Sequence, residues 1–160
     1  MSPPILPRRI WWSRRRPAGF TLIEMLLVVA IVGVLATIAI PRLGSAVEQA
    51  RVARAIGDIR AVQTDIAELD SLPLSLAAIG RGGLLDPWGR PYVYLRLAGA
   101  GRGVIGQARK DRFLVPLNSD YDLYSAGPDG ESRPPLTASP SRDDVLRANN
   151  GGFIGRASRY

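Results

Sequence analysis

The chain has 160 residues, which is enough for one domain with a core and hardly enough for two. It contains neither cysteine nor histidine, which excludes thiolate chemistry, zinc sites built on those residues and a Ser-His-Asp triad. It is basic, with 21 Lys and Arg against 14 Asp and Glu.

Residues 1–19 hold most of the excess positive charge. They are rich in proline, lack acidic residues and show no apolar period, so we predict a disordered leader. With its five arginines removed from the 21 basic residues, 16 remain against 14 acidic ones. The basic charge therefore belongs to the leader and does not indicate nucleic-acid binding. The five arginines are Arg8, Arg9, Arg14, Arg15 and Arg16.

Residues 20–40 form an apolar run of 21 residues in which Glu24 is the single charge. As a helix, this run would be about 31 Å long, which matches the hydrocarbon core of a bilayer. The arginine cluster precedes the run and no comparable cluster follows it. The positive-inside rule therefore predicts one transmembrane helix with a cytoplasmic N-terminal end and the remaining chain on the other side.

Residues 41–70 continue a helical pattern beyond Pro41. Apolar residues recur at intervals of three and four, which predicts an amphipathic helix with one stripe facing a core. If Pro41 only kinks the chain, residues 20–70 form one helix of about 77 Å. The stripe comprises Val52, Ile56, Ile59, Val62, Ile66 and Leu69.

Residues 71–160 change in character. Short runs at residues 90–97, 112–117 and 121–124 have the composition of strands, and Gly, Asp and Asn separate them. Residues 86–89 (DPWG) predict a turn before the first run. We expect the chain after Gly127 to be mostly loop. The fold class predicted is α+β, with a long N-terminal helix packed on a small antiparallel sheet.

Residues 19–24 (GFTLIE) stand between the basic leader and the apolar run. This segment resembles the cleavage signal of type IV prepilins and pseudopilins. The resemblance implies cleavage between Gly19 and Phe20 by a membrane prepilin peptidase, followed by N-methylation of Phe20. The physical argument agrees, because a cut before the apolar helix keeps that helix in the mature protein, whereas an ordinary secretory signal is removed. The alternative is a plain signal anchor.

Glu24 is a carboxylate within the predicted membrane span. Such a group is costly in lipid and is usually functional. In the pilin family the fifth mature residue is a glutamate that meets the N-terminal amine of a neighbouring subunit, and Glu24 is fifth when Phe20 is first. The resemblance thus implies an assembly role in a helical homopolymer. The alternative is a protonated glutamate near the lipid headgroups.

Two segments of the outer domain resemble the major pseudopilins of type II secretion. Residues 86–92 (DPWGRPY) are similar to a DPWG-x-PY segment of that family, and residues 122–130 (DLYSAGPDG) to a DLYSLGADG-type segment. The resemblance implies a pilin-like fold and a subunit of a periplasmic pseudopilus that drives protein export. It implies as partners other pseudopilins, the prepilin peptidase and an inner-membrane secretion platform. The protein would then be an inner-membrane protein and not an enzyme.

In that family the segment after the last strand binds Ca²⁺. Calcium prefers six to eight carboxylate and carbonyl oxygens. By resemblance the expected ligands are Ala126, Asp129, Glu131, Asp143 and Asp144. Without an ion, the adjacent carboxylates would repel and the loop would have little reason to become ordered. Residues 130–142 look longer than the family's usual loop, and the plain alternative is a solvated acidic loop.

Two other functions stay open at this point. A minor type IV pilin for adhesion or DNA uptake carries the same leader. A signal-anchored periplasmic enzyme acting on a sugar would need Asp129 and Asp143 or Asp144 to flank a cleft as acid and base. No motif for a nucleotide-phosphate loop is present.

Overall fold

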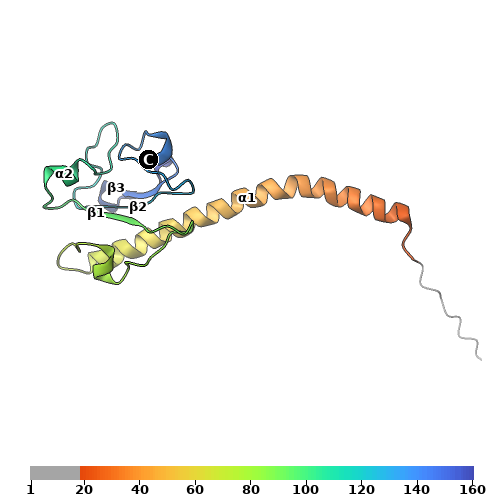
Figure 1. The fold of residues 1–160 in the computed structure, drawn as a ribbon, viewed down its shortest axis with the longest axis horizontal. Coiled ribbons are helices and arrows are strands. Elements are labelled where there is room, and N and C mark those ends of the chain that lie inside the picture. Colours follow the sequence, from red (N-terminus) through yellow and green to blue (C-terminus); the bar gives the residue numbers. More distant parts are fainter. Residues whose placement is uncertain (1–18) are drawn as a thin grey trace, which may run out of the picture. The chain divides into compact units, whose positions relative to one another are not determined.

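A computed structural model of the protein describes residues 19–160 (Figure 1). The first 18 residues of the leader predicted at residues 1–19 lie outside the described residues. The chain divides into two compact units. The first ends at Arg42, and the second is Leu43–Tyr160.

Helix α1 spans Leu22–Ala67, with Pro41 inside it (Figure 1). The prediction that the helix continues through Pro41 is confirmed. A proline removes one backbone hydrogen bond from a helix, which the neighbouring turns of a 46-residue helix can tolerate. The helix ends at Ala67, before the predicted end at Asp70, and Leu69 of the predicted stripe is exposed.

Four strands in the described residues form one antiparallel sheet with the order β1-β2-β3-β4. Tyr94 pairs with Leu123, and Tyr124 pairs with Leu146. The strands are β1 (Val93–Arg96), β2 (Tyr121–Ser125), β3 (Val145–Ala148) and β4 (Phe153–Arg156). The short helical elements are η1 (Leu76–Ile79), α2 (Arg102–Ile105), η2 (Ser139–Ser141), η3 (Asn149–Gly151) and η4 (Ala157–Arg159).

Two of the three predicted strands are confirmed. Strand β1 lies within residues 90–97, and β2 covers residues 121–124. The strand predicted at residues 112–117 is wrong, because this segment is a loop in which Phe113 is 89% exposed. The expectation of mostly loop after Gly127 is also wrong, because β3 and β4 follow it. The predicted α+β fold with a long helix and a small antiparallel sheet is confirmed.

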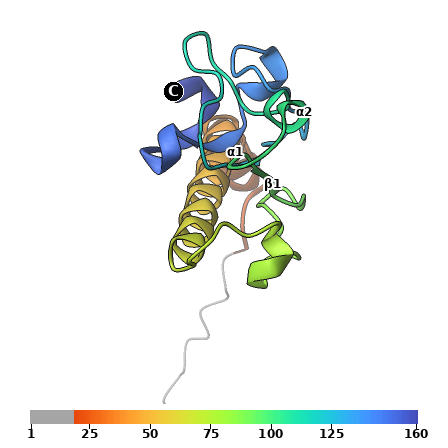
Figure 2. The same cartoon turned by 90° about the vertical axis from the view of Figure 1, so that its left-hand side faces the viewer.

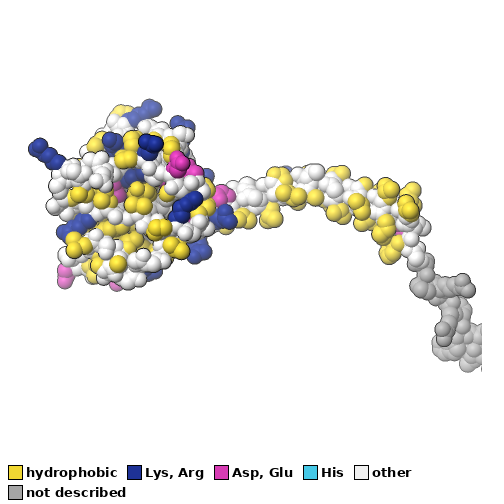
Figure 3. Space-filling model, viewed as in Figure 1, with side chains coloured by type: hydrophobic (Ala, Val, Ile, Leu, Met, Phe, Trp, Pro, Cys, Tyr) yellow, Lys and Arg dark blue, Asp and Glu magenta, His cyan; other side chains and the backbone are white. Residues whose placement is uncertain are grey.

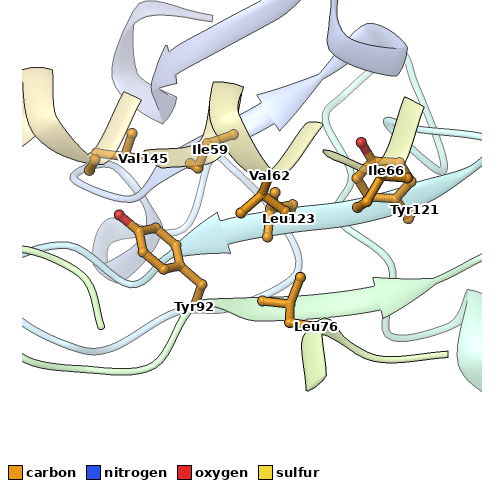
Figure 4. Packing of buried hydrophobic residues seen from close by; sticks show 9 residues of the cluster. Ile59, Val62, Ile66, Leu76, Tyr92, Tyr121, Leu123 and Val145 are labelled. Atoms are coloured by element: carbon orange, nitrogen blue, oxygen red, sulfur yellow. The ribbon is translucent and has the colours of Figure 1, made fainter. Parts of the chain in front are cut away.

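One face of the sheet packs on the C-terminal part of α1 (Figures 1 and 2). Ile59, Val62 and Ile66 of the helix point toward Leu123 and neighbouring residues in Figure 4. The inward side chains alternate along the strands, as pleated backbone requires. The buried cluster consists of Ala55, Ile59, Val62, Ile66, Leu76, Tyr92, Tyr121, Leu123 and Val145.

The opposite face of the sheet is covered by the long loops. Leu146 and Ala148 of β3 contact Leu117 and Leu136 from the segments before and after β2. All four residues of β3 are therefore buried, although the strand carries an arginine. This second cluster makes the loop after β2 part of the domain's interior.

Candidate functional site

The predicted cleavage junction lies just before the first turn of α1. Gly19 and Phe20 have no helical or strand assignment, and both are exposed. The helix begins two residues later at Leu22. The peptide bond between Gly19 and Phe20 is therefore in non-helical backbone, which a protease can bind in extended form.

Glu24 forms a capping box with Thr21. Its Oε2 accepts hydrogen bonds from the backbone N–H of Thr21 (3.1 Å) and from the Thr21 hydroxyl (3.2 Å). The Thr21 Oγ1 in turn accepts a hydrogen bond from the backbone N–H of Glu24 (3.2 Å). This reciprocal pattern satisfies donors that a helix start leaves free. The carboxylate proposed to act in assembly thus already has an intramolecular role.

The first part of α1 exposes apolar side chains (Figure 3). The described residues contain one helix, α1, that is sufficiently long and apolar to cross a membrane. No residue of its most apolar stretch is buried. Exposed contiguous apolar surface of this extent marks a membrane or protein interaction site. Of the single-pass anchor predicted at residues 20–40, residues 22–40 lie in this part of the helix.

The two motifs of the outer domain meet through Asp86. Its Oδ1 accepts hydrogen bonds from the backbone N–H of Trp88 (3.0 Å) and of Arg90 (2.8 Å). Its Oδ2 accepts one from the Ser125 hydroxyl (2.5 Å), and Ser125 Oγ accepts one from Gly127 N–H (3.1 Å). The DPWG turn therefore fixes the backbone where β2 ends and the predicted calcium loop begins.

Three predicted calcium ligands lie close together at that point. The Ala126 carbonyl accepts a hydrogen bond from Gly130 N–H (3.2 Å). Asp129 Oδ1 accepts one from Glu131 N–H (2.8 Å), and Asp129 N–H donates to Asp143 Oδ2 (3.4 Å). Residues 126–131 thus form a tight turn against Asp143.

Asp144 occupies a different environment from Asp143. It is fully buried and forms an ion pair with Arg109 through Oδ2, which also accepts a hydrogen bond from the Ser132 hydroxyl (2.6 Å). Burial raises the pKa of Asp144 to about 6, and the hydrogen bonds from Ser132 and Arg109 oppose that rise. Asp144 Oδ1 and Arg109 Nε have no hydrogen-bond partner among the described residues.

The predicted ligand set fits calcium only in part. Asp129, Asp143 and the Ala126 carbonyl are adjacent, but the Asp144 carboxylate is bound to a guanidinium. Within residues 19–160, no group of three acidic side chains is placed to hold a metal ion. Asp144 is also too deeply buried to act on a sugar beside Asp129. The calcium site stays a prediction.

The sequence analysis did not identify the capping box or the two arginines that bind the loop. A sequence signal for the capping box exists, because Thr21 and Glu24 are three residues apart before an apolar run. Arg109 and Arg90 had no local signal, because their partners lie more than twenty residues away in the sequence.

A comparison with known protein families matches the N-terminal part of the chain. The prokaryotic N-terminal methylation motif matches residues 14–40, which include the predicted cleavage junction and the apolar run at residues 20–40. A fimbrial protein of Pseudomonas aeruginosa is 48% identical over 46 residues, which are 29% of this chain and 30% of that protein. No solved structure matches the chain significantly.

Longer matches are to proteins of one name. The type II secretion system core protein G of Pseudomonas aeruginosa is 32% identical over 144 residues, covering 74% of this chain and 89% of that protein. The protein of the same name from Escherichia coli strain K12 is 31% identical over 138 residues, covering 71% and 83%. With the methylation motif, the long helix and the four-stranded sheet, these matches show that the chain belongs to the family of type II secretion system core protein G, the major pseudopilins.

Proposed function

We propose that the protein polymerises into a periplasmic pseudopilus whose growth drives protein export by type II secretion. The polymer consists mainly of copies of this chain, with other pseudopilins as minor partners. The role is structural and not catalytic. The names of the relatives support the secretion system, and the methylation motif supports processing of the subunit.

The observation that carries this proposal is that the two parts of α1 differ in burial. Its buried side chains begin at Ala55 and belong to the core of the second unit. Its large apolar residues from Leu22 to Val47 are exposed. Lipid covers these residues before assembly, and the same segments of neighbouring subunits cover them in the filament.

The proposed processing follows from the junction. A prepilin peptidase cuts between Gly19 and Phe20 on the cytoplasmic side, and the new amine of Phe20 is methylated. The arginines before the helix hold that end in the cytoplasm. The α+β domain then lies in the periplasm, and an inner-membrane secretion platform draws subunits from the membrane. Glu24 meets the Phe20 amine of a neighbour and sets the stagger between subunits.

The test is complementation of a strain from which this gene is deleted. Wild type should restore export of secreted proteins into the medium. Gly19→Val should accumulate precursor and fail to restore export, because a side chain at Gly19 obstructs the approach of the protease. Gly83→Ala is the control outside the junction and the apolar segment, because Gly83 is exposed and an added Cβ there meets nothing within 4 Å.

The outcome that contradicts secretion is specific. If the deletion leaves export normal but abolishes attachment or DNA uptake, the protein is a minor pilin. The short match to a fimbrial protein is compatible with that role, whereas the long matches favour secretion.

A further inference from the structure

The loop that joins β2 to β3 carries all five predicted calcium ligands, at residues 126–144. Its adjacent carboxylates repel one another unless a positive charge lies nearby. In the structure, two arginines from outside the loop form hydrogen bonds with loop residues. These arginines are Arg109, from the segment before β2, and Arg90, from the turn before β1.

Arg109 joins three parts of the chain through one buried guanidinium. Its Nη1 donates hydrogen bonds to Ser132 Oγ (2.5 Å) and to the Arg133 carbonyl (2.7 Å), and its Nη2 bonds Asp144. The guanidinium also lies 4.5 Å from the ring centre of Tyr124, which favours a cation–π contact. A single cation thereby fixes the middle of the loop, its end and the sheet.

The backbone beside Arg109 extends this attachment. Lys110 N–H donates to the Pro134 carbonyl (3.0 Å), and Leu136 N–H donates to the Lys110 carbonyl (2.9 Å). Arg109 N–H donates to the buried carboxylate of Asp122 (2.6 Å). The backbone at Arg109 and Lys110 is therefore bonded both to β2 and to the loop, which fixes the position from which the Arg109 side chain reaches the loop.

Arg90 performs the equivalent task at the start of the loop. Its Nη1 donates to the carbonyls of Gly127 (2.9 Å) and Pro128 (3.3 Å), and its Nη2 donates to that of Asp129 (3.4 Å). Carbonyl oxygens that converge in a turn are the ligands a calcium ion uses. Here they converge on a guanidinium.

We propose that Arg109 and Arg90 supply the positive charge that orders residues 126–144, in place of a bound calcium ion. The predicted ligands Asp129, Asp143 and Asp144 each already accept a hydrogen bond from a protein donor. Arg109 also places a full positive charge beside Asp144, which opposes binding of a second cation there. The domain consequently folds and keeps its loop ordered without calcium. This inference concerns the subunit alone and does not depend on its role in secretion.

The first test is a thermal melt of the full mature chain, residues 20–160, in detergent micelles. Removal of the leader leaves Trp88 as the single tryptophan, so its fluorescence reports on the domain. Melts are compared in millimolar calcium, in millimolar magnesium and in chelator. We expect equal melting temperatures in all three. A rise in calcium that magnesium does not reproduce overturns the proposal.

The second test replaces the cation. Arg109→Met leaves Asp144 buried without its partner, and we expect the melting temperature to fall by roughly 10 °C or more. Arg102→Met is the matched control, because Arg102 is exposed on α2 and its loss should be nearly neutral. Equal effects of the two substitutions overturn the proposal.

A loop-specific measurement covers the case in which Arg109→Met does not fold. Trypsin can cut the loop after Arg142, whose side chain is exposed, whereas the bond after Arg133 precedes Pro134 and is resistant to trypsin. We expect the Arg142 site to resist cleavage in wild type treated with chelator. The milder variant Arg109→Lys keeps the charge but loses the forked geometry, and it should be cut faster there. Rapid loop cleavage of chelated wild type, slowed by calcium, overturns the proposal.

Discussion

Asp86 and Ser125 are joined by a buried hydrogen bond of 2.5 Å between two motifs that are 39 residues apart. Asp86 comes from the turn before β1, and Ser125 is the last residue of β2. The same carboxylate accepts two backbone N–H groups of its own turn. Turn geometry before β1 and loop geometry after β2 are consequently set by one side chain.

Asp86→Ala should lower the free energy of unfolding by roughly 2–4 kcal/mol, because it leaves one buried hydroxyl and two backbone donors without their acceptor. Urea unfolding of the mature chain in detergent, followed by circular dichroism, measures the change. Asp70→Ala is the control, since Asp70 is exposed beyond the end of α1. Equal losses for the two variants would contradict the connecting role of Asp86.

Substitutions at the capping box should separate the capping role of Glu24 from its proposed role in assembly. Glu24→Gln retains an acceptor for the cap but loses the charge, so we expect a stable subunit that fails to assemble. Thr21→Val removes the cap and leaves the charge, so filaments should still form, with a cost of about 1 kcal/mol at the helix start. Electron microscopy of filaments from cells overproducing each variant gives the result. Normal filaments from Glu24→Gln would refute the assembly role of the charge.

Gly127→Ala should destabilise the domain by roughly 2–3 kcal/mol. Gly127 has a φ of +66°, and an added Cβ would lie 2.7 Å from the Asp143 carbonyl oxygen. Gly99→Ala is a matched control, because Gly99 has a φ of +74° with nothing within 4 Å of the added Cβ. Both variants bear the backbone strain, and Gly127→Ala alone has the clash. Urea unfolding should therefore show the larger loss at Gly127, and equal losses would contradict the close approach to Asp143.

Asp120 should make stability depend on pH. Burial acts to raise the pKa of Asp120, but hydrogen bonds from Arg147 at 2.7 and 2.8 Å outweigh it and hold this pKa below its ordinary value of 3.8. A depressed carboxyl pKa contributes stability above the unfolded value, and the contribution is lost as pH falls below about 4. Asp120→Asn should cost about 1–2 kcal/mol at pH 7 and much less at pH 3. A cost independent of pH in urea unfolding would contradict the ion pair.

Local patterns predicted the elements whose side chains follow one period. The stripe from Val52 to Ile66 repeats every three or four residues, and α1 buries or half-buries those positions. Strand β2 alternates between the helix side, with Leu123, and the loop side, with Tyr124. In these segments burial on one face determines both the pattern and the structure.

Strand β3 was not predicted, because the burial of its side chains depends on partners that are distant in the sequence. Arg147 looks like a surface residue in the sequence, yet it is buried against Asp120, Gln63 and the ring of Tyr121. Arg109 was missed for the same reason. The opposite error occurred at residues 112–117, whose apolar composition suggests a strand although the segment pairs with no strand in the described chain. Tertiary contacts override local propensity in each case.

The position of the loop between β2 and β3 governs the order in which the domain can fold. These strands are neighbours in the sheet, but residues 126–144 separate them along the chain. As the chain is synthesised, β1 and β2 emerge before β3, and they can already pack on α1, which precedes them. Leu146 and Ala148 of β3 arrive only after the nineteen residues 126–144 have emerged. The buried cluster on the loop side of the sheet is therefore completed last, together with the ion pair between Arg109 and Asp144.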